Sequence, residues 1–378
     1  SVSWATGTRM AHPWLLLLLP VSGLLIAGLY RLTKMENENT NAIIDSIHFG
    51  DKVPLMLVPA IFISTTITHL FGGSAGREGA ALQIGGSLGC YIGRAFRLDD
   101  KDMRLATLCG MSAVFAALFG TPLTATLFAL EVISVGVIYY SALVPCIVAS
   151  LFALEMANIF GIAPTHFDVV IEPISELMLL KVSALAIVCS LMSTVFCLSM
   201  HKTEHLFAKL IKNPYLRIAA GGALVVLITA ILGTGDYNGA GMNIIKRAIE
   251  EGQAKPDAFF WKLILTAITI GCGFKGGEVV PTFFIGATLG CVLGSLLGIP
   301  TGFAAALGLI CVFCGAVNCP VASIVLSIEL FGSTDLVYFA LACGIAYMLS
   351  GYFGLYSSQK IMYSKLKAEF INIPVSYT

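Results

Sequence analysis

Apolar runs long enough to cross a lipid bilayer recur from one end of this chain to the other. A transmembrane helix needs about 20 mostly apolar residues, and such runs cover residues 13–30, 178–200, 215–232 and 333–350. No soluble domain separates them, and the mean hydropathy of +0.88 with 12% charged residues lies outside the range of soluble domains. We therefore expect an all-α polytopic membrane protein with a single transmembrane domain over residues 1–378.

The sequence at the two ends of the chain predicts how each terminus is organised. The first run follows a cation, as in a signal peptide, but it continues past Pro20 to Tyr30 without a convincing cleavage site. We therefore expect a first transmembrane helix there. Ser1 in place of methionine suggests a missing or processed N-terminus, and residues 365–378 leave no room for a cytoplasmic regulatory domain.

Charge and cysteine usage argue against several classes of function. The formal net charge is zero, so neither nucleic acid nor an acidic partner is implied. The 11 cysteines lie mostly inside apolar runs, where a thiol behaves as a small hydrophobe, so disulfides are not expected. Cys311 and Cys314 have the spacing of a metal pair but no histidine nearby, and the six histidines are scattered. We expect no metal, no cofactor and no enzyme mechanism.

The chain also repeats itself at an offset near 200 residues. Residues 78–90 (EGAALQIGGSLGC) overlay residues 279–291 (VVPTFFIGATLGC) at an offset of 201. Residues 121–131 (TPLTATLFALE) overlay residues 319–329 (CPVASIVLSIE) at an offset of 198, and both blocks keep a proline and a final glutamate. Ordered blocks at nearly one offset indicate a duplicated, transporter-like core.

The repeat divides the chain into halves of about residues 30–165 and 230–360. The loop at residues 93–104 (GRAFRLDDKDMR) is basic, whereas its counterpart at residues 298–306 (GIPTGFAAA) has no charge. Because cytoplasmic loops carry the excess of Lys and Arg, equivalent loops on opposite sides favour an inverted repeat. A further basic loop at residues 202–217 must also be assigned to one side of the membrane, which complicates the comparison of loop charges.

Glycines and prolines interrupt the apolar blocks after Gly79 and Val280, which are too short for all of them to cross the membrane. This pattern predicts broken helices whose ends meet near the midplane, and helix N-termini suit an anion. Glu78 falls in the first turn of such a helix. We expect its carboxylate to stand in for a transported anion and to leave the site when protonated; the alternative is an ordinary helix cap.

Other charged residues flank the same positions. Glu278 precedes the equivalent helix start, which predicts either proton handling or a salt bridge with Lys275. Arg77 is expected to be structural. The repeat preserves Glu131 and Glu329, which end matching runs; both are expected to share a structural role such as bonding loop amides.

At these residues the sequence resembles the CLC family of chloride channels and anion/proton antiporters. Residues 76–80 (GREGA) are similar to the family's GREGP motif, residues 277–281 (GEVVP) to its GxFxP motif, and residues 355–357 (LYS) to its anion-site tyrosine segment. The resemblance covers nearly the whole chain. It implies a homodimer with one anion pathway per subunit, Glu78 as the external gating glutamate, and Tyr356 as an anion-coordinating hydroxyl.

The sequence also departs from the family pattern. The family's serine motif is absent, and its place falls on residues 38–42 (ENTNA), which puts Asn39 where the serine would contact the anion. Ala80 replaces a proline, and Val279 replaces the phenylalanine of GxFxP. Val132 stands where antiporters carry an internal proton-transfer glutamate. The changed serine motif together with GGEVVP resembles the fluoride-exporting branch, in which the counterpart of Glu278 is a characteristic residue.

The sequence therefore predicts a fluoride/proton antiporter of a bacterial plasma membrane, with Glu78 and Glu278 carrying protons. A chloride/proton antiporter or passive chloride channel is the alternative, and a membrane enzyme or a structural protein explains less. Fluoride is small and accepts strong hydrogen bonds, so its site needs strong donors. The residues expected at the anion site are Asn39, Gly76, Arg77, Gly79, Val279, Val280 and Tyr356.

Overall fold

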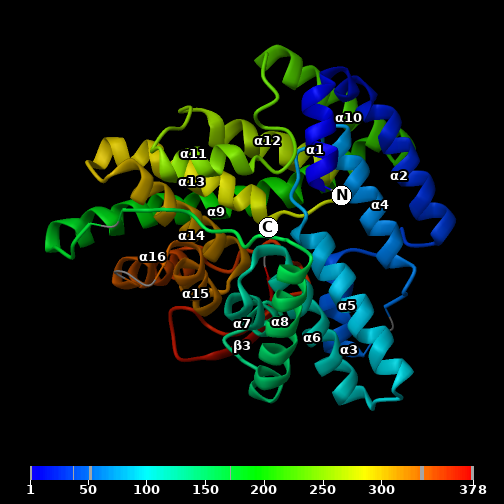
Figure 1. Cartoon of the computed structure of the whole chain (residues 1–378), viewed down its shortest axis with the longest axis horizontal. Coiled ribbons are helices and arrows are strands. Elements are labelled where there is room, and N and C mark those ends of the chain that lie inside the picture. The colour runs from blue at the N-terminus through cyan, green and yellow to red at the C-terminus, as the bar shows by residue number, and fades with distance from the viewer. Residues whose placement is uncertain (1, 37, 51–52, 171, 333–335, 376–378) are drawn as a thin grey trace.

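Helices make up most of the chain, as its apolar runs predict (Figure 1). This computed structural model describes residues 2–36, 38–50, 53–170, 172–332 and 336–375. Three residues of the expected run 333–350, residues 333–335, lie outside the described part. Residues 336–349 of that run form helix α16.

In the first half of the chain, local sequence signals set several helix starts. Helix α7 begins at Pro122, whose fixed φ suits the first helical turn. Asp99 caps α6, because its carboxylate accepts hydrogen bonds from the amides of Lys101 (3.0 Å) and Asp102 (2.8 Å). The elements are α1 (Val2–Ala11), the 3₁₀ helix η1 (Pro13–Leu18), α2 (Leu19–Thr33), α3 (Thr40–Phe49), α4 (Leu57–Leu70), α5 (Glu78–Ala95), α6 (Asp100–Phe119), α7 (Pro122–Glu131), β1 (Ser134–Val135) and α8 (Tyr140–Ile159).

The second half repeats this order of helices. Helices α4, α5 and α6 begin at residues 57, 78 and 100, and their counterparts α12, α13 and α14 begin at residues 258, 279 and 301, an offset of 201. The elements are α9 (Glu176–Leu210), α10 (Pro214–Leu232), α11 (Met242–Glu250), α12 (Ala258–Gly271), α13 (Val279–Leu297), α14 (Thr301–Val317), α15 (Pro320–Phe331), α16 (Leu336–Leu349), β2 (Lys360–Tyr363) and β3 (Phe370–Pro374).

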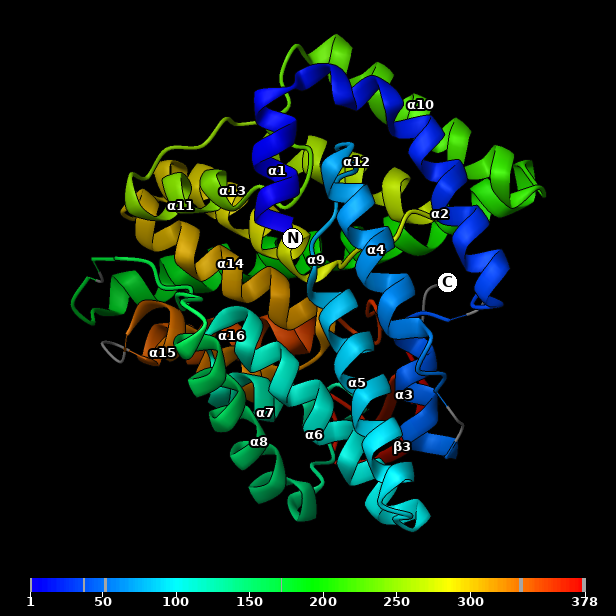
Figure 2. The ribbon, with the colours of Figure 1, turned by 45° about the vertical axis from the view of Figure 1, so that its right-hand side comes forward.

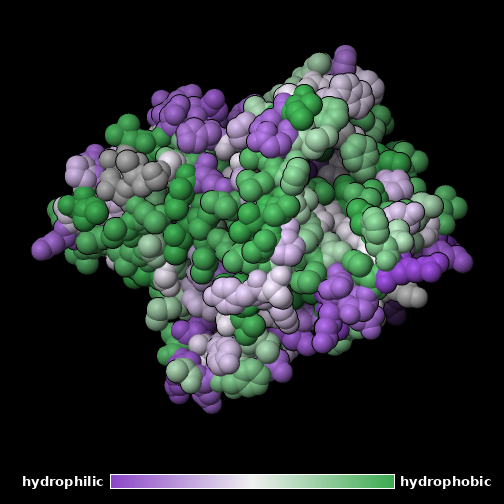
Figure 3. All heavy atoms as spheres, turned by 60° about the horizontal axis from the view of Figure 1, so that its bottom comes forward, coloured by the Kyte–Doolittle hydropathy of each residue, from purple (hydrophilic) through white to green (hydrophobic). Residues whose placement is uncertain are grey.

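Six helices in the described part are long and apolar enough to span a membrane, and they include Pro13–Thr33, the expected first span. Apolar side chains also cover much of the outer surface: Phe152 on α8 is 71% exposed and Ile231 on α10 is 75% exposed. Figure 3 shows apolar residues over a broad area of one face, with hydrophilic residues gathered toward its margins. Such a surface suits lipid rather than water.

The blocks after Gly79 and Val280 form α5, with 18 residues, and α13, with 19. Only α13 of these two is among the six candidate spans of the described residues, which agrees with the expectation that the blocks do not all cross the membrane. The breaks lie in the non-helical stretches before them, at residues 71–77 and 272–278. Glycines in these stretches let the chain turn between α4 and α5 and between α12 and α13 (Figure 2).

Glu131 and Glu329 join the two halves reciprocally. The carboxylate of Glu131, at the end of α7, accepts from the amides of Val321 (3.2 Å) and Ala322 (2.8 Å) at the start of α15. The carboxylate of Glu329, on α15, accepts from the amides of Leu123 (3.0 Å) and Thr124 (2.8 Å) at the start of α7. This confirms that the two glutamates share a structural role in bonding backbone amides. The amides lie at helix starts rather than in loops. Exchange of the halves reproduces the contacts, as a two-fold relation between them requires.

Close helix packing is also repeated. A Cβ atom on Gly85 of α5 would lie 2.2 Å from the carbonyl oxygen of Gly110 of α6, and one on Gly286 of α13 would lie 2.3 Å from that of Gly308 of α14. Only glycine permits these backbones to approach so closely. The two helix pairs therefore form equivalent rigid supports for the starts of α5 and α13.

A small three-stranded sheet was not expected from the sequence. Strand β1 pairs in parallel with β2, and β2 pairs antiparallel with β3, so the order is β1-β2-β3. The sheet ties the C-terminal segment to the loop after α7. It adds a small β element to an otherwise helical fold.

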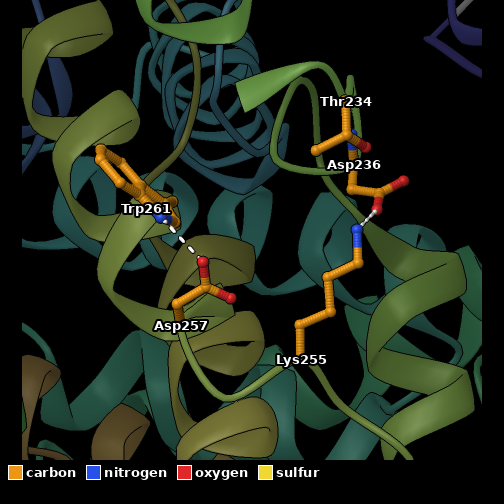
Figure 4. Close-up of polar contacts among 5 residues, drawn as sticks. All are labelled: Thr234, Asp236, Lys255, Asp257 and Trp261. Carbon is orange, nitrogen blue, oxygen red and sulfur yellow. Dashed lines mark hydrogen bonds and ion pairs between the residues drawn. The ribbon is translucent and has the colours of Figure 1, made fainter. Parts of the chain in front are cut away.

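Polar contacts fix the loops around α11 (Figure 4). The ammonium of Lys255 donates to the carboxylate of Asp236 (2.7 Å), and the indole of Trp261 donates to Asp257 (3.0 Å). Partial burial disfavours the Asp236 carboxylate, but hydrogen bonding and the charge of Lys255 outweigh it and lower the pKa of Asp236. The contact of Lys255 anchors Asp236 in the loop before α11, and residues of that loop bond the stretch before α5: the amide of Gly239 donates to the carbonyl of Gly73 (2.9 Å).

Candidate functional site

The starts of α5 and α13 meet at a two-residue bridge. Gly76 and Gly277 exchange two backbone hydrogen bonds of 2.7 and 2.8 Å in an antiparallel arrangement. The two glycines are 201 residues apart, the offset of the repeat. An antiparallel pair of equivalent residues places a local two-fold axis between the halves. The predicted meeting of two helix starts is confirmed.

The carboxylate of Glu78 occupies this junction. Glu78 is the first residue of α5 and is fully buried. Its Oε2 atom accepts hydrogen bonds from the amide of Val280 (3.2 Å), in the first turn of α13, and from the amide of Arg77 (3.0 Å). Its Oε1 atom has no hydrogen-bond partner. A negative group thus lies at the N-terminus of the opposite helix, where an anion is favoured.

The glycines at the junction leave room for that carboxylate. A Cβ atom on Gly76 would lie 2.0 Å from Oε2 of Glu78, and a Cβ atom on Gly277 would lie 2.9 Å from it. A Cβ on Gly79 would lie 3.1 Å from the carbonyl oxygen of Gly276. The glycine-rich sequence around Arg77 and Glu78 is therefore explained by the close approach of two backbones and one carboxylate.

Two further polar groups near the junction have no partner. Oε2 of Glu278, the residue that precedes α13, and the hydroxyl of Tyr356 are buried without a hydrogen bond. The charges of Glu278 and Glu78 both act on Tyr356, so the three side chains lie within electrostatic range of one another. Buried polar groups without partners are rare and call for an explanation. A bound anion or a transferred proton would supply the missing partner.

The segment that carries Tyr356 is held by both halves. The amide of Leu355 donates to the carbonyl of Ala316 on α14 (2.9 Å). The amide of Ser358 donates to the side chain of Asn41 (3.2 Å), and its hydroxyl donates to the carboxylate of Asp45 (2.7 Å), both on α3. Tyr356 is therefore fixed between the start of α3 and the end of α14.

Asn39 does not reach the junction. It is exposed, and its side chain caps α3 by accepting from the amide of Ala42 (3.1 Å). The next residue, Thr40, is buried and accepts a hydrogen bond from Gln83 (3.2 Å). Its hydroxyl lies 3.4 Å from the position of a Cβ on Gly79. The structure thus places Thr40, which the sequence did not single out, beside the site.

Arg77 and Lys275 form no ion pair with the site glutamates in the described part of the chain. The ammonium of Lys275 lies 4.2 Å from the centre of the Tyr30 ring. The alternative of a salt bridge between Glu278 and Lys275 is therefore wrong in this structure. The half-buried Arg77 side chain lines a cavity of about 890 Å³ together with residues of α1 and α11.

No group of three or more metal-ligating side chains occurs among the described residues. Cys311 and Cys314 lie on buried α14, where the thiol of Cys314 donates to the carbonyl of Cys343 (3.5 Å). Val132 is fully buried at the end of α7. Its apolar side chain offers no route for a proton.

A duplicated helical core whose broken helices present their N-termini to a buried carboxylate defines a polytopic protein of the ion-transport class. The sequence profile of the voltage-gated chloride channel family matches residues 22–351. The chain therefore belongs to this family, also called CLC, which comprises transport proteins rather than enzymes, and it is a multi-pass membrane protein.

Individual relatives agree with this assignment. A "chloride/fluoride channel protein" of Pseudomonas syringae pv. tomato is 40% identical over 97% of this chain and 82% of the relative. The crystal structure of a CLC-type fluoride/proton antiporter superposes with a TM-score of 0.92 at 32% identity, covering 95% of this chain and 91% of the other. A slow cyanobacterial chloride/proton antiporter shares the fold, with a TM-score of 0.72 at 20% identity over 92% and 88% of the chains.

Proposed function

We propose that this protein exports fluoride in exchange for protons. The observation that carries the proposal is the carboxylate of Glu78, which lies at the N-terminus of α13 and accepts the Val280 amide. The carboxylate occupies a position where an anion can bind. Transport follows if Glu78 and the anion take turns there.

The exchange can be written with the residues at the junction. An ionised Glu78 is a strong acceptor for the Val280 amide, whereas a protonated Glu78 is a weaker one and releases it. A fluoride ion then accepts that amide and the free hydroxyl of Tyr356. When fluoride leaves, Glu78 gives up its proton and returns. One fluoride ion and the ionised carboxylate of Glu78 thus alternate at a single position, and Glu78 carries one proton while fluoride is bound.

The unpartnered donors favour fluoride over chloride. Fluoride is smaller and holds its water more tightly, so its site must offer strong hydrogen bonds in return. The Tyr356 hydroxyl and the protonated carboxyl of Glu278 are two such donors, buried and unpartnered near the junction. The printed names of two relatives, one a chloride/fluoride channel protein and one a fluoride/proton antiporter, support this choice.

Proton transfer in this scheme uses Glu78 with help from Glu278. Both carboxylates lie at the junction, and each has a buried oxygen without a partner. Val132 has no proton to offer, so the internal route of chloride/proton antiporters is replaced. We also propose a homodimer with one pathway per subunit in a bacterial plasma membrane, each subunit being a single transmembrane domain with its own complete junction.

Efflux from liposomes tests the function. Purified protein is reconstituted in vesicles loaded with fluoride or chloride, and anion efflux and internal pH are recorded for wild type and Glu78→Gln. We expect wild-type fluoride efflux to drive protons inward. The glutamine variant cannot ionise, so we expect it to lose proton movement.

The alternative has a distinct signature in the same assay. Equal chloride and fluoride flux, or flux without proton movement in the wild type, would identify a chloride transporter or a passive channel and overturn the fluoride/proton proposal. Glu155→Gln, on the exposed face of α8, serves as a matched control for the loss of one carboxylate.

A further inference from the structure

A lysine is buried deep in the apolar helix α12. Lys262 is fully buried, and its ammonium donates to the carbonyl oxygens of Tyr237 (3.1 Å) and Gly239 (2.5 Å). It also lies 5.1 Å from the centre of the Phe284 ring. None of the ion pairs found among the described residues includes Lys262. A buried charge without a counter-charge is costly, so its presence requires a compensating interaction.

Lys262 lies next to the loop that presents Glu78. The carbonyl of Tyr237, which Lys262 contacts, also accepts the hydroxyl of Ser74 (2.8 Å). The amide of Gly239 donates to the carbonyl of Gly73 (2.9 Å). The charge of Glu78 acts on Lys262. The buried ammonium is thus linked, through residues 237–239, to the loop that leads to the junction, and the negative charge of Glu78 and the positive charge of Arg9 both act on it.

A second cation and a histidine complete the cluster. The guanidinium of Arg9, on α1, donates to the carbonyl of His69 (2.9 Å) at the end of α4. The ring of His69 is buried and contacts the carbonyl of Gly76 (3.1 Å), one of the two bridge glycines. The charges of Arg9, Lys262 and Arg77 all act on His69. The back of the junction is thus electropositive.

The repeat shows that the fold does not require this lysine. The equivalent of Lys262 in the first half, 201 residues earlier, is Ile61, which is also fully buried in α4. His69 likewise corresponds to Ile270. At each of these two pairs of equivalent positions, one half carries an ionisable residue and the other carries isoleucine. A role in packing alone does not account for this difference.

We infer that Lys262 is a fixed buried cation that keeps one negative charge at the junction, either the carboxylate of Glu78 or the transported anion. This inference rests on the proposed function and deepens it. With Lys262 in place, the junction is unfavourable when empty of negative charge, so departure of Glu78 favours binding of the anion. Lys262 is thereby a positioning residue that acts through its charge, while its contacts with residues 237–239 hold that charge in place.

Transport kinetics of charge variants test the inference. Concentration dependence of anion flux is measured in liposomes for wild type, Lys262→Gln, Lys262→Met and Lys262→Arg. The glutamine variant keeps hydrogen-bond donors but loses the charge, so we expect KM for the anion to rise about tenfold, the effect of one charge at moderate distance. The arginine variant keeps the charge, and we expect KM near that of wild type. Either neutral variant suffices if the other fails to fold.

Ser74→Ala is the matched control for the structural role of the loop. It removes a hydrogen bond to the same carbonyl of Tyr237 without changing any charge. We expect it to lower thermal stability while KM stays unchanged. An unchanged KM in Lys262→Gln or Lys262→Met, or an equal rise in Ser74→Ala, would overturn the inference. The measurement uses whichever anion the wild type carries, so a chloride-selective wild type would refute the fluoride proposal and still test Lys262.

Discussion

The two glutamates at the junction differ in what they bind. One oxygen of Glu78 is held by two backbone amides and the other has no partner, and one oxygen of Glu278 is also buried without a partner. Leaving a carboxylate oxygen unsatisfied has a free-energy cost of several kcal/mol if it is charged and less if it is protonated. A proton on Glu278 would lower that cost and turn the carboxyl into a donor whose hydrogen bond fluoride can accept.

Replacement of Glu278 tests its part in anion choice. Glu278→Ile removes the acid and leaves an apolar side chain, so we expect the ratio of fluoride to chloride flux to fall by about tenfold, the effect of one lost charged hydrogen bond. Parallel efflux assays with the two anions measure the ratio. Glu278→Gln keeps a hydrogen-bond donor, so we expect its fluoride-to-chloride flux ratio to fall less than that of Glu278→Ile. An unchanged ratio in the isoleucine variant would remove Glu278 from the fluoride-specific role.

The positions of Glu78, Glu131 and Glu329 were predictable because the repeat aligned them with helix starts and ends. The position of Asn39 was not predictable, because residues 38–42 begin with four polar residues in a row. A shift of one residue at the start of α3 changes which of these side chains faces inward. Lys262 was not singled out either. In an apolar run the sequence predicts a helix but not which face meets the opposite half.

At the scale of elements, each half closes on the other through a glutamate near the end of one helix that bonds amides at the start of a helix in the other half. The carboxylates of Glu131 and Glu329 each satisfy two amides that the helix itself leaves free. Glu131 is 6% exposed, while Glu329 is half-buried. The contacts are equivalent in geometry, but their environments differ.

Substitution of these glutamates is expected to lower stability rather than selectivity. Glu131→Gln replaces one acceptor oxygen by a donor and leaves a buried amide unpaired, which costs about 1–3 kcal/mol. Glu329→Gln is expected to cost less, because water reaches that side chain. Unfolding in detergent measures both. Glu155→Gln is expected to stay within about 0.5 kcal/mol of wild type, and a loss as large as that of Glu131→Gln would contradict the role given to these contacts.

The helices were largely predictable from hydropathy and from proline and glycine positions, whereas the small sheet was not. Strand β1 has two residues and β2 has four. Strands this short carry too little alternation to be seen in a sequence, and they form because the C-terminal segment lies beside the loop after α7. Tertiary contact, rather than local preference, decides them.

At the scale of the molecule, the reciprocal contacts and the antiparallel bridge agree with halves of opposite orientation. Asp99, which caps α6, corresponds to Pro300, which caps α14, and both are exposed. The basic loop around Asp99 predicts the cytoplasmic side for it. Pro300 then belongs on the other side.

Cysteine labelling tests this orientation. Ten of the 11 native cysteines are buried and Cys109 is half-buried, so background labelling is low. We expect Asp99→Cys to react with an impermeant thiol reagent only after cells are opened, and Pro300→Cys to react in intact cells. The wild type measures background. Reaction of both variants from the same side would contradict the inverted repeat.

The bridge between Gly76 and Gly277 has a consequence for how such a site can diversify. The residues that follow these glycines in the chain are Arg77 and Glu278, also 201 apart, so equivalent positions carry opposite charges. Two separate identical subunits would have to present the same residue twice. In a duplicated and fused gene the two repeats can mutate independently, so equivalent positions can acquire different residues. A junction that began as symmetric can then carry a gate in one half and a selectivity element in the other.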